Sequence, residues 1–115
     1  MELFSLLNAW VAYAGSQLAL AAIDEKDAEA ELDVRRARVL INGKAEKSVS
    51  AAKAKADEDP DVVEARNSAT AAYAVRKLTE TIHDSLERDC FLVSRELTRR
   101  TGRADREARN HRWNN

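Results

Sequence analysis

The stretch DVVEARNSATAAYAVRKLTETIHDSLERDCFLVSRELTRR, residues 61–100, decides the fold of this 115-residue chain. It contains neither proline nor glycine, and it lies between the only proline, Pro60, and Gly102. Its larger apolar residues recur at steps of four, four, four, three and four: Leu78, Ile82, Leu86, Cys90, Val93 and Leu97. Such steps place side chains on one side of an α-helix, so the stretch predicts a long amphipathic helix.

Two further helices are expected before it. The first covers about residues 2–41 and ends at Asn42-Gly43, because both residues tolerate a left-handed backbone. The second covers about residues 44–56 and is short and basic. Asp59 is a suitable N-cap, and a proline at the first helical position suits the helix that follows it.

The composition predicts an all-α protein that needs partner helices. Only 5% of the residues are aromatic and 34% are charged, and alanine, which buries little apolar area, is abundant. We therefore expect long helices in a hairpin or three-helix arrangement within an oligomeric helical bundle; a monomeric three-helix bundle is the alternative. The residues expected to make the contacts between subunits are Leu78, Ile82, Leu86, Val93, Leu97 and Trp10. A continuous coiled coil is less expected, because Asp24, Arg76 and Asp89 fall near the positions where two coiled-coil helices meet, the seam.

We expect one helical oligomerisation domain, residues 1–102, followed by a basic tail, residues 103–115, that frays in isolation. The formal net charge is −1, but its distribution is uneven. Residues 24–33 are acidic, whereas residues 95–112 carry seven arginines. Such an arginine-rich segment binds an anionic partner or the acidic segment of a neighbouring subunit.

The sequence contains no enzyme signature. Three glycines cannot build a phosphate-binding loop, and the two histidines, His83 and His111, lie far apart in the sequence. His83 with Asp84 and Glu87 is typical of a solvated helix face. We expect no catalytic residues, no metal and no cofactor.

The single cysteine and the N-terminal segment bear on localisation. Cys90 lies in the row of apolar residues from Leu78 to Leu97, the apolar stripe, where an unpaired cysteine acts as a small, partly buried hydrophobe. A single cysteine allows no disulfide within the chain. Residues 3–23 are apolar but lack the positive start of a signal peptide. We expect a core helix there, and an interfacial membrane anchor is the alternative. For the whole protein we expect a cytoplasmic location without membrane contact.

Basic side chains offer a nucleic-acid interface. Arg95, Arg99 and Arg103 are separated by four residues each, so they share a face if the helix continues past Gly102. Trp113 offers a stacking surface for bases. The residues expected to bind DNA are Arg95, Arg99, Arg100, Arg103, Arg106, Arg109, Lys44, Lys47, Lys53 and Lys55.

The order of elements resembles the UvsY-type recombination mediators of T-even phages. The resemblance covers about residues 5–101. It is carried by these segments: Asn8-Ala9-Trp10, Lys47-Ser48-Val49, Asp57-Glu58-Asp59-Pro60-Asp61-Val62 and Leu92-Val93-Ser94-Arg95-Glu96-Leu97.

The resemblance implies a homo-oligomer that binds single-stranded DNA and helps to load a recombinase. It implies no catalytic residues, and it implies DNA contacts from the Lys44–Lys55 and Arg95–Arg112 regions. The arginine-rich tail after Gly102 and the net charge of −1 depart from that pattern. The alternative function is a helical protein–protein interaction module, such as a phage assembly factor or an inhibitor of a host protein, that binds no nucleic acid.

Overall fold

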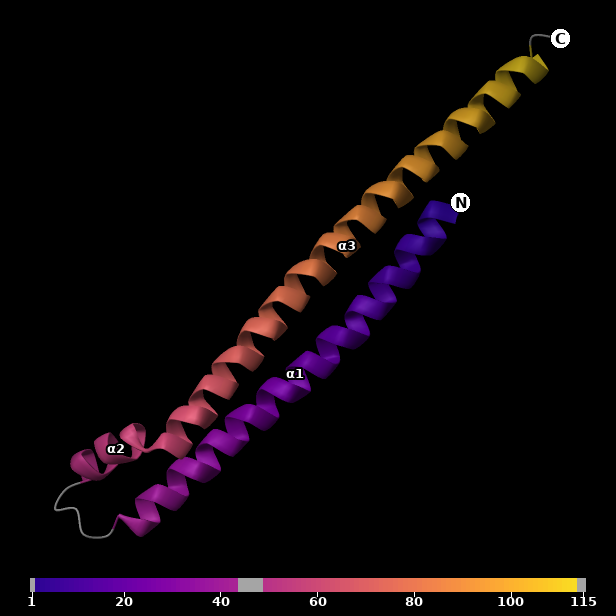
Figure 1. Cartoon of the computed structure of the whole chain (residues 1–115). Coiled ribbons are helices and arrows are strands. Elements are labelled where there is room, and N and C mark those ends of the chain that lie inside the picture. The colour runs from indigo at the N-terminus through magenta and orange to yellow at the C-terminus, as the bar shows by residue number, and fades with distance from the viewer. Residues whose placement is uncertain (1, 44–48, 114–115) are drawn as a thin grey trace. The chain divides into compact units, whose positions relative to one another are not determined.

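The computed structural model describes residues 2–43 and 49–113 and contains three helices in that part of the chain (Figure 1). Helix α1 spans Glu2–Asn42, α2 spans Val49–Glu58, and α3 spans Pro60–Trp113. No strand occurs among the described residues. The all-α prediction is confirmed.

The start of α3 follows the predicted capping. The backbone N–H of Asp61 donates to Asp59 Oδ1 at 2.9 Å, and Pro60 occupies the first helical position. The end of α3 differs from the prediction, because the helix passes through Gly102 and continues to Trp113. A glycine costs a helix only about 1 kcal/mol relative to alanine, and the residues around Gly102 favour helix. The boundary between residues 102 and 103 therefore lies inside one helix; a separate role for the tail stays a prediction.

The chain divides into two compact units. The terminal unit combines α1 up to Gly15 with α3 from Thr81 onward, and the central unit comprises Ser16–Glu80. Each unit contains an antiparallel pair of helices from α1 and α3.

In the central unit, the least exposed residues follow a heptad pattern, with alternating steps of three and four along both helices. On α1 they include Leu18, Ala21, Glu25, Ala28 and Leu32; on α3 they are Val62, Ala65, Ala69, Ala72, Arg76 and Thr79. This spacing is the signature of a coiled-coil seam. Alanines fill much of it, and small side chains allow two helices to approach closely.

Helix α2 is fixed at its C-terminal end within the central unit. Ala56 is fully buried. The carboxylate of Asp57 lies 3.4 Å from Arg36 of α1 and 3.3 Å from Arg66 of α3. Arg66 also donates to the backbone carbonyl of Asp57 at 3.1 Å. These contacts join all three helices of this unit.

In the terminal unit, the same heptad spacing continues along each helix. The half-buried or buried residues are Phe4, Leu7, Val11 and Ala14 on α1, and His83, Leu86, Cys90, Val93 and Leu97 on α3. The thiol of Cys90 donates to the side-chain oxygen of Asn8 at 3.1 Å. A Cβ added at Gly15 would lie 3.4 Å from His83 Nε2, so glycine leaves room there for the imidazole.

The predicted apolar stripe is divided between two surfaces. Leu86, Val93 and Leu97 are half-buried at the seam within the chain, whereas Leu78 and Ile82 are 66% and 58% exposed. Each step of four residues advances about 40° beyond a full helical turn, so a series of such steps winds away from the seam. Contacts of these two residues with another subunit stay a prediction, because an oligomeric bundle is not part of this structure.

The expectation that polar residues interrupt a coiled coil is wrong for Arg76. Arg76 lies on the seam of the central unit, but Glu25 of α1 pairs with it there. Asp24 and Asp89 lie one residue before their nearest seam positions and are exposed.

Candidate nucleic-acid interface

The part of α3 between Arg88 and Trp113 carries a row of arginines on the side away from the seam. We call Arg88, Arg95, Arg99, Arg103 and Arg106 the arginine face. Four of them, without Arg103, recur at steps of seven, four and seven, which keeps side chains on one side of an α-helix. All five are exposed.

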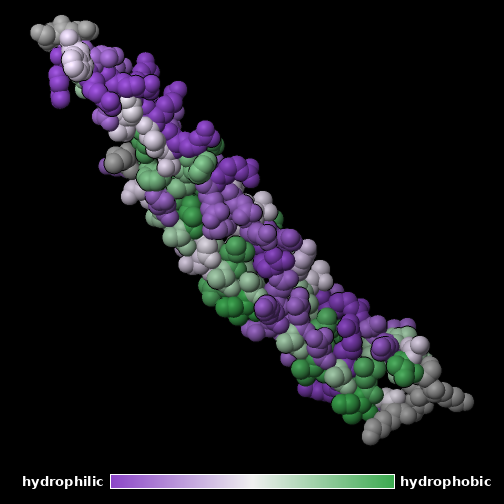
Figure 2. All heavy atoms as spheres, turned by 180° about the vertical axis from the view of Figure 1, so that it is seen from behind, coloured by the Kyte–Doolittle hydropathy of each residue, from purple (hydrophilic) through white to green (hydrophobic). Residues whose placement is uncertain are grey.

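The arginine face points away from α1. Arg88 lies midway in sequence between Leu86 and Cys90, and Arg95 lies midway between Val93 and Leu97. A distance of two residues corresponds to about half a helical turn, so both arginines lie opposite the seam of the terminal unit. Figure 2 shows hydrophilic side chains covering the end that carries the C-terminus. A ligand can therefore reach the arginine face without displacing α1.

The carboxylates of the described residues from 85 onward lie beside the line through Arg88 and Arg106, although Glu96 shares its side of the helix with Arg103, seven residues later. The acidic side chains of this segment are Glu87, Asp89, Glu96, Asp105 and Glu107. Each lies about a quarter turn or more from the line through Arg88 and Arg106, on one flank or the other. The positive charges are thus gathered on the outer side, and the negative charges flank them.

Two of these acids bind neighbouring arginines. Glu96 accepts from Arg99 Nη2 at 3.0 Å and from Arg100 Nε at 3.1 Å. These hydrogen bonds, first that from Arg99 and then that from Arg100, lower the pKa of Glu96 below its ordinary value. Arg103 Nε lies 3.4 Å from Glu107. The acids therefore orient part of the face while reducing its net charge.

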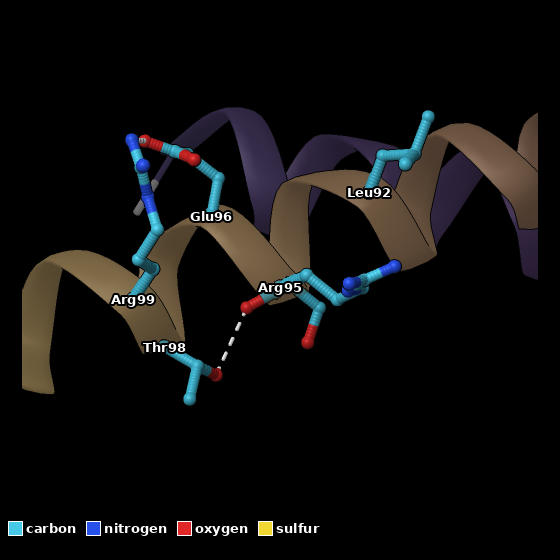
Figure 3. Close-up of a pocket in the computed structure, with 6 residues that line it drawn as sticks. Leu92, Arg95, Glu96, Thr98 and Arg99 are labelled. Carbon is cyan, nitrogen blue, oxygen red and sulfur yellow. Dashed lines mark hydrogen bonds and ion pairs between the residues drawn. The ribbon is translucent and has the colours of Figure 1, made fainter.

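Arg95 has a different environment. Its guanidinium carbon lies 5.9 Å from the centre of the Phe91 ring, a cation–π distance. Figure 3 shows Arg99 turned toward Glu96, while Arg95 extends away from that carboxylate. The depression drawn there has a volume of about 760 Å³, and Leu92, Arg95 and Arg99 are among the residues that line it. Arg95 thus presents its charge next to an exposed aromatic ring.

The structure brings most of the sequence-predicted arginines together. Arg95, Arg99, Arg103 and Arg106 lie on the arginine face, and Arg109 lies at its edge. Arg100 does not: it lies three residues after the seam residue Leu97, on the side that faces the beginning of α1, and lines a depression with Leu3 and Phe4.

The predicted lysines are not part of this face. Lys53 and Lys55 are exposed on α2, which belongs to the central unit. Lys44 and Lys47 lie outside the described residues. Sequence reasoning missed Arg88 and Phe91, although Arg88 lies seven residues before Arg95, which is a detectable heptad signal.

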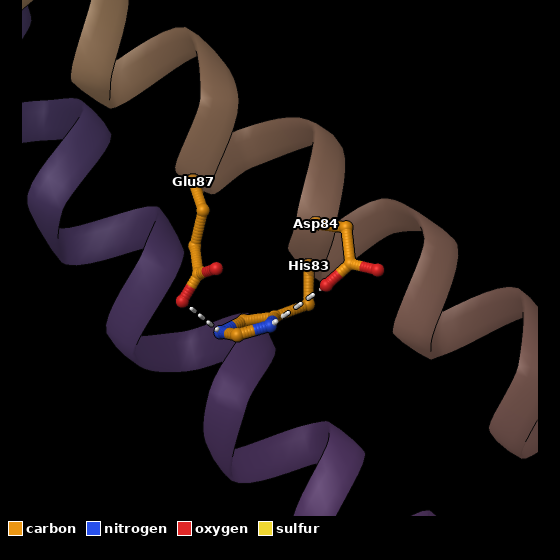
Figure 4. A group of neighbouring side chains, drawn as sticks. All are labelled: His83, Asp84 and Glu87. Atoms are coloured by element: carbon orange, nitrogen blue, oxygen red, sulfur yellow. Dashed lines mark ion pairs between the residues drawn. The ribbon is translucent and has the colours of Figure 1, made fainter.

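His83 forms a small polar group with Asp84 and Glu87 (Figure 4). Their candidate ligand atoms lie within 4.8 Å of one another. His83 Nε2 is 3.4 Å from Glu87, and Nδ1 is 3.8 Å from Asp84. The prediction of a solvated histidine is wrong, because the side chain of His83 is only 18% exposed and lies at the seam near Gly15. Both carboxylates are exposed as predicted.

A second surface feature lies on the first part of α1. Leu3, Leu6, Trp10 and Tyr13 are each more than half exposed, and the rings of Trp10 and Tyr13 meet edge to face at 5.9 Å. The expected core helix thus buries one side only in this structure. Helix α1 is long and apolar enough to cross a membrane, a test that core helices of soluble proteins and signal sequences also pass.

No protein-family model matches the chain, and no curated protein and no solved structure matches it either.

Proposed function

We propose that this chain is a non-enzymatic accessory protein that self-associates and binds single-stranded DNA along the arginine face. By its resemblance to UvsY-type mediators, it acts as a recombination mediator together with a recombinase, in the cytoplasm (the host cytoplasm if it is phage-encoded). The single observation that carries the proposal is an exposed row of arginines that is directed away from the seam and has acidic side chains only on its flanks.

The dimensions of the arginine face suit a single strand. Arg88 and Arg106 are eighteen residues apart, which corresponds to about 27 Å along a helix. A strand of several nucleotides spans that length, comparable with the smaller site sizes of known single-strand binders. Guanidinium groups spaced along a helix contact phosphates rather than base edges, so this mode of binding is largely independent of sequence.

Exposed aromatic rings favour a single strand over a duplex. Phe91 lies beside Arg95, and Trp113, at the end of α3, is 85% exposed. Unpaired bases stack on such rings, whereas the bases of a duplex are already stacked on one another. Arginine adds stacking through its planar guanidinium group.

Self-association supports the same function. Leu78, Ile82 and Trp10 are large apolar residues that are exposed in the single chain, and burial of such side chains against another copy is favourable. An assembly of several copies presents several arginine faces to one strand. Multivalent contact of this kind raises the overall affinity without any new contact in each subunit.

The test is the salt dependence of binding to a fluorescent oligonucleotide, measured by anisotropy. Each phosphate neutralised contributes about −0.7 to the log–log slope. Replacing Arg95, Arg99 and Arg103 together with alanine should make the slope less steep by about 2, with helicity unchanged. The matched control replaces three exposed cations of the central unit: Lys26, Arg38 and Lys77. No binding by the wild type at low salt would refute the proposal.

A helical protein–protein interaction module is the second candidate. The apolar side of α1 formed by Leu3, Leu6, Trp10 and Tyr13 favours it, because exposed aromatic and aliphatic residues are typical anchors of protein interfaces. The oligonucleotide experiment separates the two candidates: a self-associating protein that ignores DNA at low salt fits the second one.

A further inference from the structure

The large exposed apolar residues of the terminal unit lie mainly on one flank. Leu3, Leu6, Trp10 and Tyr13 each directly precede a seam residue of α1. Ile82 and Leu92 directly precede the seam residues His83 and Val93 of α3. In an antiparallel pair, the positions that precede the seam lie on the same flank of both helices. We call this side of the terminal unit the apolar flank.

On α3, the positions of the terminal unit that precede the seam form a row with the same alternation of three and four residues, from Ile82 to Trp113, and Ile82, Leu92 and Trp113 are its exposed apolar residues. These positions have the spacing of a second coiled-coil seam. The midpoint of this row falls between Glu96 and Arg99. An antiparallel second copy of α3, centred on that midpoint, would match every position of the row with one position of its partner.

Charges in this arrangement are complementary. Glu96 of one copy meets Arg99 of the other, and Asp89 meets Arg106; the two-fold axis repeats both pairs. All four residues lie on the flank, and the three besides Glu96 are exposed in the single chain. Exposed ion pairs contribute little affinity, but they select register and orientation.

The remaining positions pair two apolar residues, two polar residues, and one apolar residue with an arginine. Ile82 meets Trp113, which pairs two exposed apolar side chains. Ser85 meets Asn110, which are both polar, and Leu92 lies against the aliphatic part of Arg103.

We propose that a second copy of this chain docks on the apolar flank, with the two α3 helices antiparallel and the two-fold axis between Glu96 and Arg99. This inference rests on the self-association in the proposed function and identifies its interface. Arg99, Arg103 and Arg106 also belong to the arginine face. Arg88 and Arg95 lie outside this row of positions, so they stay available to single-stranded DNA on both copies of the dimer.

The first experiment uses full-length variants without nucleic acid. An acidic variant carries Arg99→Glu and Arg106→Glu, and a basic variant carries Asp89→Arg and Glu96→Arg. Each places like charges opposite one another in a homodimer, whereas a mixture of the two restores all four pairs. We expect light scattering to show at least about a tenfold weaker self-association for each variant alone and recovery on mixing. Unchanged masses throughout, or no recovery in the mixture, would overturn the proposal.

The second experiment tests the register. Ser85→Cys with Asn110→Cys, in a Cys90→Ala background, should form a disulfide-linked dimer under mild oxidation. These two cysteines are about 37 Å apart along one helix, so they cannot pair within a chain. The matched control moves the second cysteine to position 108, on the other side of α3, and should stay unlinked. Equal cross-linking of both variants would overturn the proposed register.

Other outcomes separate this inference from the proposed function. An assembly that persists in both charge variants, together with DNA binding, would refute the interface and leave the function standing. A monomeric wild type would refute the self-association on which both rest. Flotation of a monomeric wild type with anionic lipid vesicles would assign the apolar flank to a membrane surface and overturn the inference.

Discussion

Arg76 of α3 forms a salt bridge with Glu25 of α1 at the seam of the central unit. The side chains are 22% and 11% exposed, and Arg76 also binds Glu80 at 2.7 Å. The hydrogen bond that Arg76 donates to Glu25 is the main cause that raises the pKa of Arg76 above its ordinary value. A charged pair at a seam that otherwise carries mainly alanines and larger apolar residues favours the single alignment of the helices in which both charges are satisfied.

Removal of one partner should be more harmful than removal of both. We expect Glu25→Ala to lower the melting temperature by about 5–10 °C, because it leaves Arg76 at the seam with less compensation. The double variant Glu25→Leu/Arg76→Leu should melt near or above the wild type while losing its fixed helix alignment. Circular dichroism measures both melting temperatures. A single variant as stable as the wild type would show that the pair does not set the alignment.

The exposed and seam-facing leucines of α3 should respond differently to a charge. Leu78→Asp should retain the helicity of the wild type and reduce the mass of its assembly, because Leu78 is exposed in the single chain. Leu86→Asp should lower the melting temperature by about 10 °C or more, because it places a carboxylate at the seam beside α1. Circular dichroism and light scattering on the same samples check both outcomes. The reverse order of effects would mean that the seam is wrongly assigned.

The number and type of the helices could be predicted from the sequence because the residues that begin and end helices act locally. Asn42-Gly43 and Asp59-Pro60 act through their own backbones, and both mark helix ends in the structure. Gly102 misled the prediction, because a single glycine costs less than the helix gains from its neighbours. The exposed surface of Leu78 was harder to predict, since it depends on which side of α3 contacts α1.

The seam itself escaped the search for large apolar residues. In the middle of α3 it runs through Arg76, Thr79 and His83, which no apolar pattern detects. The arginine face was predicted in part, because Arg95, Arg99 and Arg103 are spaced four apart. Arg88 was missed because it lies between Glu87 and Asp89, in a segment of mixed charge. Only the helix shows that these three side chains lie on different sides.

Cys90 should react slowly with thiol reagents in the native protein. It is half-buried at the seam, as predicted, and its thiol donates to Asn8 of α1. A reagent reaches it only when the helices separate locally, so labelling should accelerate at least about tenfold in denaturant. Asn8→Ala should give an intermediate rate in native buffer. Native labelling as fast as in denaturant would place the thiol outside the seam.

Glu96 should restrain DNA binding, and its restraint should depend on pH. The pKa of Glu96 is lowered by hydrogen bonds from Arg99 and Arg100. Its pairing with them therefore stabilises the folded helix fully at pH values above the ordinary pKa of a carboxyl group. This contribution is lost as the pH falls through the lowered pKa. Carboxyl NMR should find Glu96 titrating below the ordinary range of a glutamate.

Replacement of Glu96 removes the restraint at every pH. Glu96→Gln should raise the affinity for a single-stranded oligonucleotide by about two- to fivefold at low salt, because Arg99 and Arg100 no longer face a carboxylate. Glu29→Gln, an exposed glutamate of the central unit, is the matched control and should change little. Equal gains in both variants would show that net charge alone determines the affinity, and the arginine face would then have no special part in binding.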